Sequence, residues 1–205
     1  MKKIGLITIG MPVLFSMLFS YCGEYEMEQT IFIPDATDSN LPAYTEWGYN
    51  SFGALYERTY FLAAKDIVPC KITVQNGILT FSLSGWVSSS YSSYSNREKM
   101  TLYFSFPAGE TMNNYKDLLA IHQKTIDLTD PSCEVKMIRD SKTENVTIIS
   151  GSLFFQRVQL LRINEKEDRA ILSGTFDLMF LRNQLPEVLS KGRFDVGIAN
   201  LFIIP

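Results

Sequence analysis

Acid–base chemistry in this chain would depend on carboxylates, because the sequence has one histidine, His122, against 22 aspartates and glutamates. Two carboxylates that face each other across a cleft can hydrolyse a glycosidic bond. The candidates for such a pair are spread along the chain: Glu46, Glu57, Asp66, Asp177 and Asp195. The last two fall on the polar side of predicted strands. A solvated surface, or a cross-strand pair with Arg193 or Lys191, is therefore the alternative explanation for them.

Other kinds of reactive site have little support in the sequence. His122 falls on the apolar stripe of a predicted helix, where a packed or capping histidine is more common than a catalytic one. The chain has neither C-x-x-C nor H-E-x-x-H spacing, so no metal site is predicted. It also lacks the G-x-S-x-G elbow, the P-loop and the G-x-G-x-x-G fingerprint. We therefore expect no metal and no cofactor, and we favour a protein that is not an enzyme.

A serine- and tyrosine-rich loop has the composition best suited to binding. Residues 88–96 read Ser-Ser-Ser-Tyr-Ser-Ser-Tyr-Ser-Asn and follow closely on Trp86. Aromatic rings with polar edges offer stacking surfaces, and serines offer adaptable hydrogen bonds. We therefore predict that Trp86, Tyr91 and Tyr94 bind a glycan or a partner protein, with residues 47–52 as the second choice. The commoner alternative is a mobile loop whose tyrosines bind nothing specific and whose Trp86 belongs to the core.

Alternation of apolar and polar residues predicts the strands that position these side chains. The clearest case is a hairpin from Cys70 to Trp86, whose Asn76-Gly77 turn suits the positive φ angles of a type I′ turn. Further strands are predicted at residues 100–106, 133–138, 146–150, 153–163, 170–180 and 192–198. Strands joined by short turns pair antiparallel. The predicted fold is all-β with about eight or nine strands, either a β-sandwich or a lipocalin-like flattened barrel.

One short helix is predicted near residues 114–122. Asn114 can cap its start, and Asp117 lies three residues later in the first turn. Four residues at helical spacing form its apolar stripe: Tyr115, Leu118, Leu119 and His122. Residues 54–60, within an aromatic-rich segment, are a second helix candidate.

The N-terminus indicates where the protein works. Lys2 and Lys3 precede an apolar run at residues 4–19, which is shorter than the roughly 20 residues of a membrane-spanning helix. We therefore predict that residues 1–21 are a signal peptide. Residues 18–22 (LFSYC) resemble a bacterial lipoprotein signal, which implies that Cys22 becomes the lipid-modified first residue, and the acidic residues 23–28 resemble the tether that follows such a cysteine. The alternative is an ordinary secretory signal cut near Ser20.

Charge and the remaining cysteines set further limits. The formal net charge is −3, and the sequence has no run of lysine and arginine, so nucleic acid is not expected as a partner. Membrane contact is expected through the N-terminal lipid. Cys70 and Cys133 could form a disulfide in an oxidising compartment. Otherwise they are free thiols that pack as small hydrophobic groups.

Three short segments carry a resemblance to a family: residues 47–54 (WGYNSFGA), 172–176 (LSGTF) and 191–195 (KGRFD). Together they resemble surface lipoproteins of Bacteroidetes-type bacteria whose all-β domain has no established function. The resemblance implies a lipid-anchored protein of the cell envelope, at the outer membrane or cell surface, and it transfers no catalytic residues. We predict a lipidated cysteine and tether at residues 22–40 and one β domain at residues 41–205.

Two functional hypotheses follow from these observations. The first is a non-enzymatic envelope protein whose β domain binds a glycan or a protein. The alternative is a carboxylate-dependent hydrolase that acts on envelope or extracellular glycans. An aromatic patch would favour binding, whereas a deep cleft with paired acids would favour the hydrolase.

Overall fold

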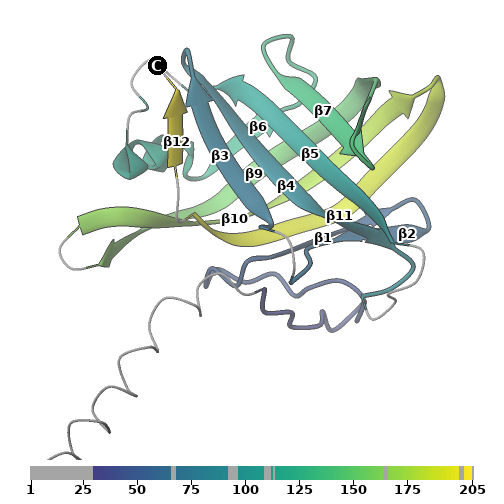
Figure 1. Cartoon of the computed structure of the whole chain (residues 1–205), viewed down its shortest axis with the longest axis horizontal. Helices are drawn as coiled ribbons and strands as arrows, with labels where there is room; N and C mark the ends of the chain where they lie inside the picture. Colours follow the sequence, from purple (N-terminus) through teal and green to yellow (C-terminus); the bar gives the residue numbers. More distant parts are fainter. Residues whose placement is uncertain are drawn as a thin grey trace, which may run out of the picture.

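The structure, a computed structural model, describes residues 30–65, 68–91, 97–108, 112, 114–163, 166–198 and 201–204. The predicted signal peptide and Cys22 lie outside these residues. Most of the described chain is β-strand, and the strands form one sheet that curls into a half-barrel (Figure 1). The prediction of an all-β fold is confirmed. No helix in the described part of the chain is both long and apolar enough to cross a membrane.

The sheet has twelve strands, more than the eight or nine predicted. Their bounds are β1 (Ser51–Tyr56), β2 (Thr59–Leu62), β3 (Cys70–Gln75), β4 (Ile78–Ser88), β5 (Glu98–Pro107), β6 (Lys124–Asp127), β7 (Glu134–Arg139), β8 (Lys142–Glu144), β9 (Val146–Ile163), β10 (Lys166–Arg182), β11 (Leu185–Ile198) and β12 (Leu201–Ile204). Ten follow the order β6-β9-β10-β11-β1-β2-β4-β5-β7-β8, while β3 pairs with β4 and β12 pairs with β3. The β3–β12 pair is parallel, and the other pairs are antiparallel.

The predicted hairpin at residues 70–86 is present. β3 pairs with β4 from Cys70 opposite Leu83 to Gln75 opposite Ile78. Asn76 has φ of 50° and Gly77 has φ of 75°, so both turn residues occupy the left-handed region that a type I′ turn requires. A local turn signal was therefore sufficient to set the register of this pair.

The predicted helix at residues 54–60 is wrong, because these residues belong to the β1–β2 hairpin. Glu57 takes φ of 52° at the turn, and the Thr59 hydroxyl donates a hydrogen bond to the Tyr56 carbonyl at 2.8 Å. β1 is buried almost throughout, since five of its six residues are buried and Leu55 is half-buried. A strand covered on both faces lacks the polar–apolar alternation that identifies a strand in the sequence.

The helix predicted near residues 114–122 is present as the 3₁₀ helix η2 (Tyr115–Ile121). Asn114 caps it together with Asp117, as predicted. Its buried residues are Leu118 and Ile121, which follow the three-residue period of a 3₁₀ helix, while Leu119 is 43% exposed. The predicted α-helical stripe was therefore wrong at Leu119 and at His122. The latter is an exposed C-cap residue whose Nδ1 accepts the Val158 N–H at 3.1 Å.

Phenylalanine rings fill the inside of the curled sheet. Phe81 of β4, Phe155 of β9 and Phe194 of β11 are in mutual contact, with centroid separations of 5.0 to 5.7 Å. All three are fully buried. Strands from distant parts of the sequence thus share one core.

Cys70 and Cys133 are free thiols in the structure, so the predicted disulfide is corrected. Cys70 is buried in the core and Cys133 is half-buried against it. Burial raises the pKa of both thiols, and the nearby Asp130 carboxylate adds to the effect at Cys133. Both therefore pack as small, unreactive apolar groups, which is the alternative that the sequence left open.

The prediction of a tether up to residue 40 is wrong for residues 30–40, because these residues pack on the β domain. Thr30 is buried, and the Ile31 N–H donates to the Tyr49 carbonyl at 2.8 Å. Arg193 of β11 donates to Asp35 at 2.6 Å. Hydrogen bonds from Thr37 lower the pKa of Asp35, and Arg193 lowers it further. This stretch is polar in composition but is part of the fold.

Candidate functional site

Asp195 on β11 binds the chain segment that borders the candidate site, residues 44–50, which we call the Trp47 segment. Its carboxylate is 1% exposed and accepts three backbone N–H bonds, from Trp47 at 3.0 Å, Gly48 at 2.7 Å and Tyr49 at 3.3 Å. Two hydroxyls complete the set, Thr45 at 2.5 Å and Ser173 at 3.1 Å. Consecutive N–H groups that converge on one anion hold a loop in a single conformation.

The prediction that Asp195 lies on the polar side of its strand is correct. The prediction that this side is solvated, or that Asp195 pairs with Arg193 or Lys191, is wrong. The Trp47 segment covers that side, so the carboxylate is buried and neither solvated nor paired with Arg193 or Lys191. Arg193 pairs with Asp35 instead. By contrast, Asp177 is exposed, as the surface alternative predicted.

Trp47 itself is exposed although its backbone is fixed. Its side chain is 74% exposed, the largest value among the exposed large hydrophobic residues of the described chain. Gly48 follows with φ of 76°, and a Cβ there would lie 3.0 Å from the Ile171 side chain. The backbone at Gly48 thus packs closely against Ile171 on the outer face of β10, and the indole of Trp47 points toward solvent.

A pocket of about 340 Å³ lies beside Trp47. Its lining comprises Glu46, Trp47 and Gly48 of the Trp47 segment, Arg157, Gln159 and Leu161 of β9, Arg169, Ala170 and Ile171 of β10, and Gly197 and Ile198 of β11. The volume lies within the range of small-ligand sites. We call it the Trp47 pocket.

Strand register explains why residues so far apart in sequence line one pocket. Residues paired across antiparallel strands point to the same face of the sheet. Ile171 is paired with Gln159 on one side and with Gly197 on the other, and Arg169 is paired with Leu161. Successive rows on the outer face of β9, β10 and β11 therefore form the floor.

Charges in the pocket are only partly compensated. Arg157 forms an ion pair with Glu46 at 2.9 Å, and the Tyr44 hydroxyl donates to Glu46 at 3.0 Å. The hydrogen bond from Arg157 is the main reason that the pKa of Glu46 is lowered. The side chain of Arg169, which is half-buried, makes no hydrogen bond or ion pair with another described residue. Two arginines and one glutamate leave one net positive charge in the lining.

The predicted binding residues lie at a second pocket, of about 320 Å³. Trp86 and Tyr91 line it together with Leu62, Ala63, Ala64, Lys65, Ser88, Ser90 and Arg97. Tyr94 lies outside the described residues. Trp86 is half-buried, and the Tyr91 ring stacks on Phe32 with centroids 3.6 Å apart, so one face of that ring is covered. The structure thus brings Trp86 and Tyr91 together, but Trp47 is the more accessible aromatic side chain.

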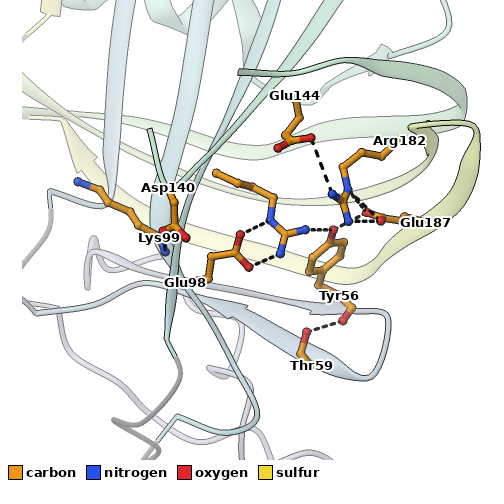
Figure 2. A network of polar contacts seen from close by, with 9 residues as sticks. Tyr56, Thr59, Glu98, Lys99, Asp140, Glu144, Arg182 and Glu187 are labelled. Atoms are coloured by element: carbon orange, nitrogen blue, oxygen red, sulfur yellow. Dashed lines mark hydrogen bonds and ion pairs between the residues drawn. The ribbon is translucent and has the colours of Figure 1, made fainter. Parts of the chain in front are cut away.

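A separate cluster of acids and arginines crosses the inside of the curl (Figure 2). The buried Tyr56 hydroxyl donates to Glu187 and accepts from Arg139 at 3.1 Å. Arg139 also binds Glu98, and Arg182 binds Glu187 at 2.6 Å. In Figure 2, Glu187 and Arg182 lie on one side of Tyr56 and Glu98 lies on the other. We call this cluster the Tyr56 network.

Glu187 of the Tyr56 network does not have the raised pKa of the general acid in a two-carboxylate hydrolase. Burial raises the pKa of Glu187, but hydrogen bonds from Arg182 and Tyr56 outweigh burial and hold the pKa below its usual value. A general acid requires the opposite shift. Among the other sequence candidates, Glu46 is ion-paired, Glu57 accepts the Val188 N–H, and Asp66 lies outside the described residues. Across the described residues, no group of three or more histidine, cysteine or acidic side chains forms a metal site.

Comparison with family models, with curated proteins and with solved structures found no match. The candidate site therefore depends on its own geometry. The resemblance to Bacteroidetes-type lipoproteins remains a prediction. Its three segments do lie together in the structure, since β1, β10 and β11 are neighbouring strands and Asp195 contacts Ser173 and the Trp47 segment.

Sequence reasoning ranked the Trp47 segment second and missed Arg157, Gln159 and Arg169. Arg157 and Gln159 occupy polar positions of a predicted strand, and Arg169 directly precedes the next predicted strand, so all three look like ordinary solvent-facing residues. The available signal was the Trp-Gly pair in a segment without regular alternation. Such a pair indicates an aromatic side chain next to a backbone position that can take a positive φ angle. It does not show which strand the segment covers.

Proposed function

We propose that the protein is a lipid-anchored cell-envelope protein whose β domain binds a glycan in the Trp47 pocket. The signal-like residues 1–21 and Cys22 support the envelope part of this proposal. The binding part rests mainly on one observation, the exposure of Trp47 on a backbone that Asp195 fixes. Soluble proteins rarely hold a large ring in water, and a ring held in place loses little entropy when a ligand stacks on it.

The chemistry of the pocket favours a sugar. Pyranose rings present a flat C–H face that stacks on an indole, while their hydroxyls need several hydrogen-bond partners around the ring. Gln159 and the Glu46–Arg157 pair provide donors and acceptors beside Trp47, and Leu161 and Ile171 provide an apolar floor. A flat protein interface would not require a concave site of this size.

Trp47→Ala tests this function on a glycan array probed with the detergent-solubilised full-length protein. We expect the variant to lose roughly tenfold or more in affinity for the bound glycan, since stacking on an aromatic ring is worth about 1–3 kcal/mol. Its melting temperature should stay nearly unchanged, because exposed substitutions usually cost less than about 0.5 kcal/mol.

Tyr91→Ala is the matched control in the second pocket, and it should retain glycan binding. The reverse pattern, loss with Tyr91→Ala and retention with Trp47→Ala, would move the site to the pocket that the sequence predicted. Capture of a protein but of no glycan by the wild type would contradict the proposal.

A further inference from the structure

The charge distribution in the Trp47 pocket indicates the kind of sugar that it takes. Arg157 is already bound to Glu46, so its charge is largely compensated. Arg169 lies on the neighbouring strand β10 and is half-buried in the pocket lining, and its guanidinium has no polar partner among the described residues. A guanidinium withdrawn from water in this way is stabilised most by an anion that enters the pocket.

Among the described residues, the surroundings of Arg169 offer no carboxylate that lacks a partner, so an anionic ligand group can fill this place. Its cross-strand partner is Leu161, an apolar residue, and the lining residues nearest in sequence are Ala170 and Ile171. The one carboxylate in the lining, Glu46, already accepts from Arg157 and Tyr44. The pocket thus keeps one positive charge in a chain whose formal net charge is −3.

We infer that the Trp47 pocket selects an acidic sugar, whose ring stacks on Trp47 and whose carboxylate or sulfate pairs with Arg169. This inference rests on the proposed glycan-binding function. The guanidinium offers a planar fork of N–H donors that matches two oxygens of one anionic group, which a lysine cannot do. Arg169 and Trp47 come from different parts of the chain, so the sugar ring and its acidic group are bound by separate elements.

Chemical editing of the ligand provides the first test and requires no protein variant. The full-length wild-type protein in detergent is applied to one glycan array in three forms: native, with carboxylates reduced to hydroxymethyl groups, and with sulfates removed. We expect binding to the native acidic glycans and a loss of roughly tenfold or more on one of the edited arrays, since a charge-assisted hydrogen bond is worth about 1.5–3 kcal/mol. The array that loses binding identifies the anion.

Arg169→Gln provides the second test, with Arg58→Gln as the matched control. Arg58 is exposed at the β1–β2 turn and lines neither described pocket. We expect Arg169→Gln to lower affinity for the acidic glycan by roughly tenfold or more, and we expect the edited ligand to cause no further loss in this variant, because both changes remove the same contact. Arg169→Lys should recover only part of the affinity, whereas Arg58→Gln should bind as the wild type does.

The outcomes separate this inference from the proposed function. Equal binding of native and edited glycans, with binding still lost in Trp47→Ala, would overturn the acidic-sugar inference and leave glycan binding in place. Additive losses from Arg169→Gln and from ligand editing would also overturn it, because the anion would then contact another residue. Glycan binding that does not depend on Trp47 would overturn both.

Discussion

Asp195 is the residue that connects the fold to the candidate pocket. Its carboxylate organises the Trp47 segment through three backbone N–H bonds and the Thr45 hydroxyl. An asparagine has the same size but only one acceptor oxygen, and its NH₂ group would face N–H donors. The role of Asp195 is thus one that only a carboxylate performs well.

Asp195→Asn should lower the free energy of unfolding by about 2–4 kcal/mol, because several hydrogen bonds to a buried charge are lost together. The amides of Trp47, Gly48 and Tyr49 should also exchange with solvent faster than those of β10. Urea unfolding and hydrogen exchange measure the two effects. Asp177→Asn, an exposed change on the neighbouring strand, should alter neither. Slow exchange at Trp47 in Asp195→Asn would show that other contacts hold the segment.

The free thiols allow a second prediction at the residue scale. In a Cys22→Ser variant, the denatured and non-reduced protein should show two reactive thiols with Ellman's reagent, because Cys70 and Cys133 are unpaired. In the native protein Cys133 should react slowly and Cys70 should not react, since burial raises the pKa of each and limits access. Fewer than two thiols after denaturation would restore the disulfide that the sequence predicted.

At the scale of elements, signals contained within one segment were predicted well. The Asn76-Gly77 turn and the Asn114–Asp117 capping box each depend on residues a few positions apart, and both are present. The errors concern elements whose surroundings come from elsewhere in the chain. Residues 54–60 were a helix candidate because both faces of β1 are covered and show no alternation. The polar residues 30–40 were taken for a tether because Arg193, the partner of Asp35, is distant in sequence.

The Tyr56 network joins the two halves of the curled sheet. Tyr56, Arg182 and Glu187 belong to β1, β10 and β11, whereas Glu98 and Arg139 belong to β5 and β7. In the strand order, these two groups are separated by β2 and β4. The network therefore links strands that are not hydrogen-bonded to each other. We expect it to stabilise the curled shape of the sheet.

Tyr56→Phe should destabilise the fold by about 1–2 kcal/mol at pH 7, because it removes one donor to Glu187 and one acceptor for Arg139. The effect should shrink as the pH falls into the range where Glu187 takes up a proton. Glu187 has a folded-state pKa below its ordinary 4.5, so the stability that it contributes is complete above that value and is lost as the pH falls through the lowered pKa. Urea unfolding at pH 7 and at a series of lower pH values measures the difference. The control is Tyr103→Phe, since the Tyr103 hydroxyl makes no hydrogen bond with a described residue. A loss that stays equal at every pH at which the protein is folded would show that Glu187 is not the acid-sensitive partner.

At the scale of the whole molecule, the sequence predicted the fold class but not the site. Periodicity identifies which residues face inward, and this was enough for an all-β fold. The Trp47 pocket depends on a loop lying on the outer face of β9, β10 and β11, and it is set by the contact of Asp195 with a segment about 150 positions earlier in the chain. No local pattern encodes such a contact, so the pocket could be found only after the strands were placed.

The short stretch of chain between Cys22 and Thr30 limits how far a lipid anchor could hold the domain from the membrane. Thr30 is buried in the β domain, and the chain from Cys22 to Thr30 can span at most about 28 Å when fully extended. A lipid on Cys22 would therefore keep the domain close to the membrane surface.

Cys22→Ser should accordingly release the protein from the membrane fraction and leave glycan binding at the Trp47 pocket intact, because the lipid is the expected source of membrane affinity and the net charge of −3 does not favour anionic lipid. Membrane fractionation, followed by the array assay on the released protein, measures both expectations. Wild-type protein should remain in the membrane fraction after a high-salt wash, which removes proteins that are held by charge alone. A Cys22→Ser variant that also remains there after this wash would show that another part of the chain provides the anchor.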